Sequence, residues 1–420
     1  MRRRLTGRTS ALGAPGALAR AMRVVGITAT GVLLLVLAAV GWLVAAYIGG
    51  RSLFLMAYGA VAALGLGYLL GRQRRALTGR RSDLPARIRE GQRVDVELEL
   101  AATRRVSAIL LEEQLHPHLG RPRRMSIDTV AGGETARHTY SMTPALRGVY
   151  KVGPLVAVWT DPFGFTRHEV ELAPAQEVIV HPTTEHVDDR PLTRQWEDPP
   201  VRPPVSKPWS SGFEFYGMRD YSPGDDTRRI VWRATARSGR VLVREFEQGI
   251  TDRVTLVLDT DAVYHSPGDP SDSFEAAVRT VASLGVRHLR DGFAVTLETN
   301  GARLAAGLRG AAAVLPFLDL LARVQPTGDR LDQAITRMIA DPRRDAHNVV
   351  VTPHLDEAGA ARLKLLLDRG GAVELVALLW EESDPASLSR AAALGCQVVQ
   401  LRPRQPLDAV FARELGAGRR

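Results

Sequence analysis

The chain has 420 residues, enough for two or three domains. Its basic excess is confined to one end. Residues 1–90 contain 14 arginines and two acidic residues, whereas the rest of the chain carries 41 basic and 44 acidic side chains. A nucleic-acid binder needs positive charge on the folded surface that meets phosphates, so this distribution argues against nucleic acid as a partner. The single cysteine, Cys396, excludes an intramolecular disulfide, and its apolar neighbours indicate a small buried residue.

Two uncharged segments follow the basic N-terminal segment (residues 1–23). As helices, residues 24–48 would reach roughly 37 Å and residues 52–70 about 28 Å, each close to the thickness of a bilayer core. The short turn between them predicts a transmembrane helical hairpin over residues 24–71. A cleaved signal peptide is the alternative, but its apolar core would be shorter and a second span would not follow at once.

Arginines flank both ends of this hairpin. Six precede the first span, and five follow the second: Arg72, Arg74, Arg75, Arg80 and Arg81. The positive-inside rule therefore predicts a two-pass protein of the inner (cytoplasmic) membrane, with both termini and the soluble body in the cytoplasm. The lipid bilayer is the first expected partner.

Residues 85–185 contain about eight short apolar runs, separated by turn residues and without a segment of helical period between them. The first run alternates strictly: Val94, Val96 and Leu98 are separated by acidic residues. This spacing predicts an antiparallel β-sandwich. Residues 186–211 follow as a proline-rich connector, which should lie extended because proline cannot pair in a sheet.

A signature segment, residues 212–248, interleaves aromatic residues with arginines. Two interpretations are open. Its charged residues could form a paired network that locks the β domain to the next domain, since buried charges require partners. Alternatively, the segment is a recognition surface for a protein partner, since Arg, Tyr and Trp are favoured at binding hot spots. The candidate residues are Arg219, Tyr221, Gly224, Asp225, Arg228, Trp232 and Arg237.

The spacing of this segment, from Gly212 through Trp232 to Arg237, closely resembles the bacterial domain of unknown function family fifty-eight. The stretches 147–150 (Arg-Gly-Val-Tyr) and 161–164 (Asp-Pro-Phe-Gly) are also typical of that family. The resemblance implies a membrane protein with a von Willebrand factor A-like domain, associated with a MoxR-type AAA+ ATPase. It implies no known reaction.

Residues 250–415 alternate between strand and helix patterns, which predicts a doubly wound α/β domain. The resemblance makes it von Willebrand A-like. Strands are expected at 254–258, 293–297, 347–352, 373–379 and 397–401. Helices are expected at 271–290, 311–323, 331–339, 356–369, 386–394 and 407–415.

The first of these strands ends in Asp259, where von Willebrand A-like domains open a metal site of the form Asp-x-Ser-x-Ser. Here Asp261 stands at the first serine position and Val263, which has no ligand oxygen, at the second. Asp259 and Asp261 are therefore weak candidates for a cation such as Mg²⁺. The alternative is a pair that caps a helix and forms a turn.

The leading functional hypothesis is a non-enzymatic, membrane-tethered cytoplasmic scaffold or adaptor that works with a MoxR-type AAA+ ATPase. The chain has no phosphate loop, no nucleophile elbow and no zinc-protease motif. Two alternatives remain open: a metal-dependent enzyme with a carboxylate site at Asp259 and Asp261, joined by Asp225, or a structural protein of the cell envelope. The oligomeric state is left open.

Overall fold

The computed structural model describes residues 26–70, 77–161, 163–187, 215–221, 230–246, 253–341, 347–369, 372–380 and 385–411. The chain divides into two units, Met1–His181 and Pro182–Arg420, each with an apolar core. The segment 1–23, most of the connector 186–211 and the signature residues Gly224, Asp225 and Arg228 lie outside the described residues.

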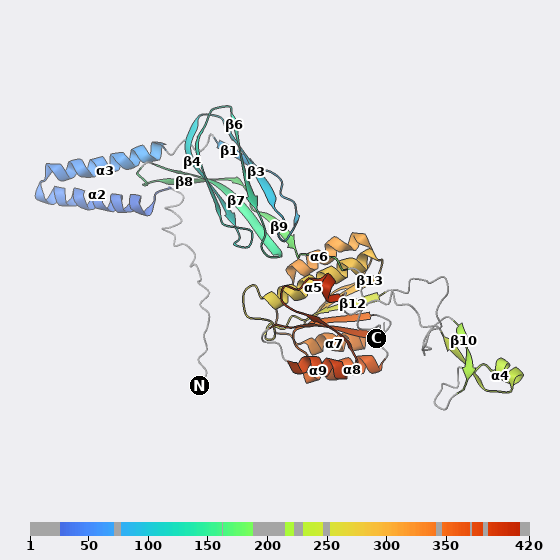
Figure 1. The fold of residues 1–420 in the computed structure, drawn as a ribbon. Helices are drawn as coiled ribbons and strands as arrows, with labels where there is room; N and C mark the ends of the chain where they lie inside the picture. Colours follow the sequence, from blue (N-terminus) through green and yellow to red (C-terminus); the bar gives the residue numbers. More distant parts are fainter. Residues whose placement is uncertain are drawn as a thin grey trace, which may run out of the picture. The chain divides into compact units, whose positions relative to one another are not determined.

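The two apolar segments form helices α2 (Ala29–Ile48) and α3 (Arg51–Leu70), which lie side by side in Figure 1. Both are long and apolar enough to cross a membrane, and their large side chains are mostly exposed. The first helix begins five residues later than predicted, because Ile27 instead forms a β-bridge with Thr166. Thr28 caps α2, since its hydroxyl accepts a hydrogen bond from the Gly31 amide at 3.2 Å.

Residues 77–181 form two β-sheets. The first has the order β1 (Leu77–Arg81), β3 (Val94–Ala102), β6 (Thr135–Met142) and is antiparallel. The second has the order β2 (Arg87–Arg89), β9 (Gln176–His181), β7 (Gly148–Thr160), β4 (Val106–Leu115), β5 (Arg123–Val130), with β8 (Arg167–Ala173) beside β7. Side chains of both sheets, such as Leu98 of β3 and Leu111 of β4, belong to one buried cluster. The pairing is antiparallel as predicted, except that β2 and β9 are parallel.

Strand β7 replaces two predicted strands, which the sequence separated at Gly153-Pro154. Proline has no amide hydrogen to donate to a ladder, and it is tolerated where the pairing is irregular. The ladder between β4 and β7 shifts register at this point, between the pairs Glu113–Leu155 and Leu115–Val152. The strand therefore continues through the proline.

Arg80 and Arg81, counted among the arginines that follow the second span, belong to the β region. Both lie in β1, and Arg81 is buried. Its Nη1 donates to the Glu113 carboxylate at 2.6 Å and to the Val152 carbonyl at 3.2 Å. Because a buried carboxylate needs a charged or hydrogen-bonding partner, Arg81 stabilises the core of the β region. Arg72, Arg74 and Arg75 lie outside the described residues.

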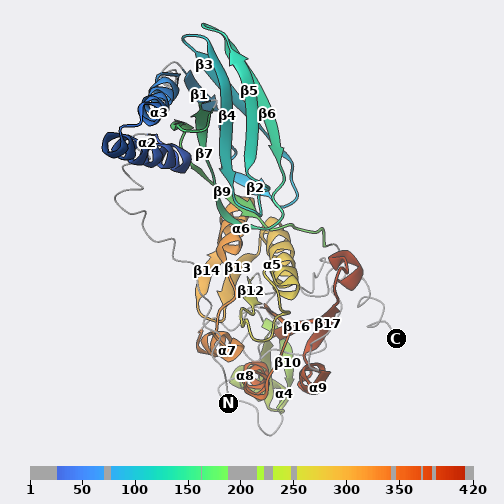
Figure 2. The same cartoon turned by 90° about the vertical axis from the view of Figure 1, so that its left-hand side faces the viewer.

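Residues 253–401 form a mixed, mostly parallel sheet with the order β14 (Arg303–Leu308), β13 (Ala294–Thr299), β12 (Arg253–Leu258), β15 (His347–Thr352), β16 (Ala372–Leu378), β17 (Gln397–Leu401). One face is covered by α5 (Asp272–Arg290) and α6 (Val314–Arg323), the other by α7 (Leu331–Ala340), α8 (Glu357–Asp368) and α9 (Pro385–Ala393), as Figures 1 and 2 show. The predicted elements are confirmed within a few residues, and the last helix is described over residues 407–411. Strand β14, an antiparallel edge strand, was not predicted.

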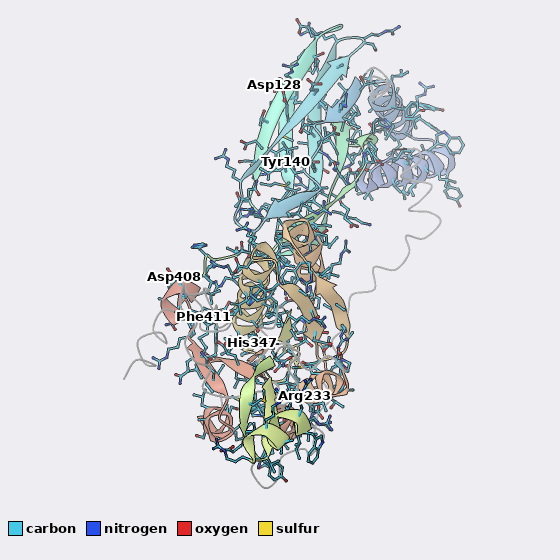
Figure 3. The ribbon with its side chains drawn as sticks, turned by 90° about the vertical axis from the view of Figure 1, so that its right-hand side faces the viewer. Asp128, Tyr140, Arg233, His347, Asp408 and Phe411 are labelled. Carbon is cyan, nitrogen blue, oxygen red and sulfur yellow. The ribbon has the colours of Figure 1, made fainter. Side chains whose placement is uncertain are left out.

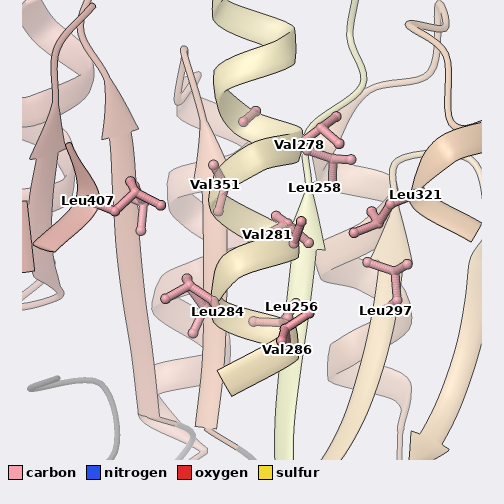
Figure 4. Packing of buried hydrophobic residues seen from close by; sticks show 14 of the residues in the cluster. Leu256, Leu258, Val278, Val281, Leu284, Val286, Leu297, Leu321, Val351 and Leu407 are labelled. Atoms are coloured by element: carbon pink, nitrogen blue, oxygen red, sulfur yellow. The ribbon is translucent and has the colours of Figure 1, made fainter. Parts of the chain in front are cut away.

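Alternate side chains of the central strand β12 enter two different cores. Leu256 and Leu258 pack against α5, including Val281, on one face (Figure 4). Val257 faces the other way and packs with Ile335 of α7. This arrangement requires β12 to be apolar on both faces, as a buried parallel strand is. It also holds the end of β12 rigidly at the centre of the sheet.

Candidate functional site

Asp259 follows β12 at the point where the order of the strands reverses. The chain passes from β12 to β13 on one side and later returns to β15 on the other. In open α/β sheets, ligands bind at such a switch point, beyond the carboxyl ends of the strands. Asp259 is 1% exposed there, so this carboxylate lies inside the sheet edge and not on its surface.

Both carboxylate oxygens of Asp259 accept hydrogen bonds. Oδ1 accepts from the Asp261 amide at 3.0 Å and from Nδ2 of Asn300 at 2.6 Å. Oδ2 accepts from the Thr352 hydroxyl at 2.6 Å. Asn300 follows β13 and Thr352 ends β15, so the three neighbouring strand ends close around one carboxylate. Asp259 was a predicted candidate, whereas Asn300 and Thr352 were missed; the signal for each was its place at the end of a strand.

The ring of His265 contacts the backbone of Asp259. Its Nε2 is 3.0 Å from the Asp259 carbonyl oxygen, and its Nδ1 is 3.0 Å from the Ser273 hydroxyl. A carbonyl oxygen only accepts, so Nε2 carries the proton in this contact. Burial lowers the pKa of His265 and raises the pKa of Asp259, although hydrogen bonds from Thr352, Asp261 and Asn300 oppose the second shift. A neutral imidazole with both nitrogens hydrogen-bonded positions the loop after β12.

The side chain of Asp261 also accepts a hydrogen bond from the backbone. It is buried, and its Oδ1 accepts a hydrogen bond from the Val263 amide at 3.0 Å, which closes a local turn. The loop is fixed further by Thr327, whose carbonyl accepts from the Ala262 amide at 2.9 Å. The Thr327 hydroxyl lies 3.1 Å from that of Thr260. These contacts match the alternative in which the two aspartates form a turn.

In this structure the carboxylate oxygens of Asp259 are engaged by protein donors and do not face a cation. Mg²⁺ requires oxygen atoms directed at the ion, but the oxygens of Asp259 face an amide, an N–H₂ group and a hydroxyl. Position 263 offers no ligand oxygen, and the Val263 side chain is 78% exposed. Within the part of the chain that the structure describes, no group of three or more His, Cys, Asp or Glu residues is arranged to hold a metal.

The rim above Asp259 is apolar and aromatic. Val263 projects into solvent, and the ring of Tyr264 stacks on that of His354, with centroids 4.0 Å apart and an interplanar angle of 15°. Arg330 pairs with Asp356 nearby along this edge of the sheet. The rim therefore offers a surface suited to protein contacts above a closed polar interior.

The signature segment forms a separate hairpin of β10 (Phe215–Asp220) and β11 (Leu242–Phe246), with helix α4 (Trp232–Ser238) between them. The Tyr221 amide donates to the Val241 carbonyl at 2.8 Å. Trp232 is 68% exposed, and Arg237 is exposed in the last turn of α4. Arg233, labelled in Figure 3, lies on the same helix. Arg219 lies in β10, opposite Val243.

The fold and the site define a protein with two apolar helices, a β-sheet region and a mixed α/β domain whose switch point is closed by hydrogen bonds. Residues 217–384 match the family described as protein of unknown function DUF58. This confirms the family predicted from the signature segment. No curated protein matches the chain.

Solved structures show weak similarities. The CARDB domain of the PF1109 protein from Pyrococcus furiosus, solved in solution by NMR, is 18% identical, covering 25% of this chain and 94% of that one with a TM-score of 0.19. The same domain in complex with di-metal ions is 17% identical, with coverages of 25% and 86% and a TM-score of 0.19. A β-glucosidase from Listeria innocua in complex with gluconolactone is 16% identical, with coverages of 25% and 16% and a TM-score of 0.17. The metal ions and the gluconolactone are properties of those proteins.

Proposed function

We propose that this protein is a membrane-tethered cytoplasmic scaffold or adaptor, whose von Willebrand factor A-like domain and signature hairpin bind a MoxR-type AAA+ ATPase. The observation that supports this proposal is the hydrogen bonding of Asp259. The position where the fold would bind a ligand is occupied by a carboxylate whose two oxygens accept three hydrogen bonds from the protein. Protein donors thus occupy most of the roughly four lone-pair sites of this carboxylate, which favours binding at the surface over catalysis.

The membrane tether rests on the helices and on charge. Helices α2 and α3 are apolar and largely exposed, so burial in lipid removes their side chains from water. Six arginines precede them, and Arg72, Arg74 and Arg75 follow. Arg81 is buried against Glu113, which removes it from this count but leaves the sign unchanged, so the positive-inside rule still favours a cytoplasmic body.

The von Willebrand A-like assignment is supported by topology. The sheet runs in the order β14-β13-β12-β15-β16-β17, with only the edge strand β14 antiparallel, and it carries helices on both faces. The family resemblance adds the ATPase as the expected partner. Exposed Trp232 and Arg237 supply the residue types that dominate binding energy at protein interfaces.

Binding of the purified full-length chain in nanodiscs to the MoxR-type ATPase of the same organism tests the proposal by biolayer interferometry. Trp232→Ala and Arg237→Glu should each weaken binding by about tenfold or more, as expected at a hot spot. Arg290→Glu is the matched control, because Arg290 is also an exposed arginine in the last turn of a helix. Absence of binding by the unmodified chain would overturn the proposed partner.

Titration calorimetry of the chain with Mg²⁺, Ca²⁺ and Mn²⁺ tests the closed site separately. Because both oxygens of the Asp259 carboxylate already accept hydrogen bonds from the protein, no saturable heat is expected at millimolar metal. A saturable signal that disappears in Asp259→Ala, and persists in a control such as Asp408→Ala on the exposed surface, would favour the metal-dependent alternative.

A further inference from the structure

Asp161 organises the hydrogen bonds of the loop that precedes β8, residues 163–166. Its Oδ1 accepts from the Phe163 amide at 2.8 Å, and its Oδ2 accepts from the Thr166 hydroxyl at 2.8 Å and also from the Thr166 amide. Gly164 has φ +73°, a conformation that favours glycine, and its amide donates to the Asp161 carbonyl at 3.0 Å. These hydrogen bonds define the course of the backbone that carries Phe163 and Phe165.

This loop is hydrogen-bonded to the start of the first apolar helix. The Thr28 amide donates to the Phe165 carbonyl at 2.9 Å, and the Thr28 hydroxyl, which caps α2, lies 2.6 Å from the Gly164 carbonyl. The Arg167 amide donates to the Gly26 carbonyl at 2.8 Å. A β-carbon on Gly31 would collide with the Phe165 carbonyl oxygen. The backbone of the loop is therefore in direct contact with the first turn of α2.

The end of the second helix meets the same loop. The Thr166 hydroxyl lies 3.4 Å from the Gly67 carbonyl, and a β-carbon on Gly67 would lie 3.2 Å from Cγ of Asp161. Gly31 is the third residue of α2, and Gly67 precedes the last residue of α3 by three. At the helical rise of about 1.5 Å per residue, the loop contacts the hairpin within about 5 Å of its open end.

Two exposed aromatic side chains, Phe163 and Tyr68, lie at the open end of the hairpin. Phe163 is 59% exposed and stacks on Phe165 with centroids 5.7 Å apart. Tyr68, at the same end of α3, is 43% exposed and contacts His168 edge to face. Aromatic rings are favoured at the level of lipid headgroups, and an exposed phenylalanine in water is unfavourable. The aromatic surface continues directly from the apolar hairpin.

We infer that Phe163, supported by Phe165, inserts into the headgroup–acyl boundary of the bilayer and forms a second membrane contact that fixes the β region against the lipid surface. The inference rests on the proposed membrane-spanning hairpin. It assigns to the Asp-Pro-Phe-Gly stretch the role of joining the hairpin, the β region and the lipid. The ligand is the phospholipid surface, and the hairpin contacts set the depth of the rings.

Lipid-phase quenching of a fluorescent label tests this in the full-length chain, in nanodiscs of phosphatidylcholine and phosphatidylglycerol. In a Cys396→Ala background, nitrobenzoxadiazole is attached at Phe163→Cys, at Leu43→Cys within α2 and at Asp128→Cys on β5. The label is itself an aromatic ring, so it substitutes for the phenylalanine. Leu43 and Asp128 are both exposed, so labelling there should leave the packing intact.

The label at position 163 should show blue-shifted emission and strong quenching by lipids that carry a nitroxide near the headgroup. The label at 128 should show neither effect, and the label at 43 should be quenched best by deeply placed nitroxides. Quenching at 43 but not at 163 would overturn the inference alone, whereas loss of quenching at both would overturn the membrane hairpin as well.

Equal thermal unfolding of Phe163→Ser and the unmodified chain in detergent would show that the ring has no internal structural role, and a large destabilisation would count against a lipid contact.

Discussion

Asp259 is surrounded by donors that come from three separate strand ends. From the sequence, its spacing from Asp261 indicates a degenerate metal site, because both are carboxylates at the end of a buried strand. In the fold, Asn300 and Thr352 donate to Asp259, and Asp261 turns its own carboxylate to the Val263 amide. The same residues therefore stabilise a loop, and their hydrogen bonds partly oppose the effect of burial on the Asp259 carboxyl group.

Thr352→Val tests how much this network contributes. Valine has nearly the same shape but no hydroxyl, so Oδ2 of Asp259 would lose its donor while staying buried. We expect a loss of about 1–3 kcal/mol in the free energy of unfolding, because a buried acceptor, here a carboxylate, would be left unsatisfied. Denaturant unfolding of the purified chain measures it.

The matched control for this substitution is Thr139→Val, at an exposed position in β6. Valine suits an exposed strand position as well as threonine does, so the free energy of unfolding should change by no more than about 0.5 kcal/mol. If Thr352→Val proves equally neutral, the hydrogen bonds of Asp259 do not contribute to the stability of the fold.

At the scale of elements, the helices were more predictable than the strands. Helix α5 was expected at 271–290 and spans Asp272–Arg290, with Ser271 as its N-cap, because an apolar stripe and a capping serine are both local signals. Strand β14 was missed, because its sequence Arg-Leu-Ala-Ala-Gly-Leu lacks the β-branched residues that mark a strand. Its position is decided by antiparallel pairing with β13.

The contact between α5 and α6 requires a glycine at position 285. A β-carbon there would collide with the ring of Phe317, which is fully buried in α6. Alanine is favoured over glycine in a helix by about 1 kcal/mol, but overpacking a core usually costs about 1–3 kcal/mol. Gly285→Ala should therefore destabilise the protein, as measured by its melting temperature.

A double substitution provides the control for this contact. If the collision is the cause, Gly285→Ala combined with Phe317→Leu should be less destabilising than the sum of the two single changes. Gly41→Ala in α2 should not destabilise the protein, because no atom outside the local helix lies within 4 Å of a β-carbon at that position. Additive effects of the Gly285 and Phe317 changes would rule out the collision.

At the scale of the whole molecule, the arginine-flanked hairpin predicts on which side of the membrane the body lies. Protease added to intact spheroplasts should leave residues beyond α3 uncut, and permeabilisation should expose them. Immunoblotting with an antibody against the α/β domain follows the product. Digestion without permeabilisation would place the body outside the cytoplasm and exclude any cytosolic ATPase as its partner.

The sequence by itself determined the apolar hairpin, the family and most strands and helices, because hydrophobic period, capping residues and motif spacing are local properties of the chain. Only the tertiary structure decided what the charged residues do. Arg81 was grouped with the membrane flank until β1 placed it against Glu113, and Asp259 resembled a cation ligand until β13 and β15 brought Asn300 and Thr352 beside it. The contact of the Phe163 loop with α2 joins residues more than 130 positions apart, which no local pattern encodes. Partners of a buried charge are set by neighbours in space, and the sequence does not specify them until the strands are ordered.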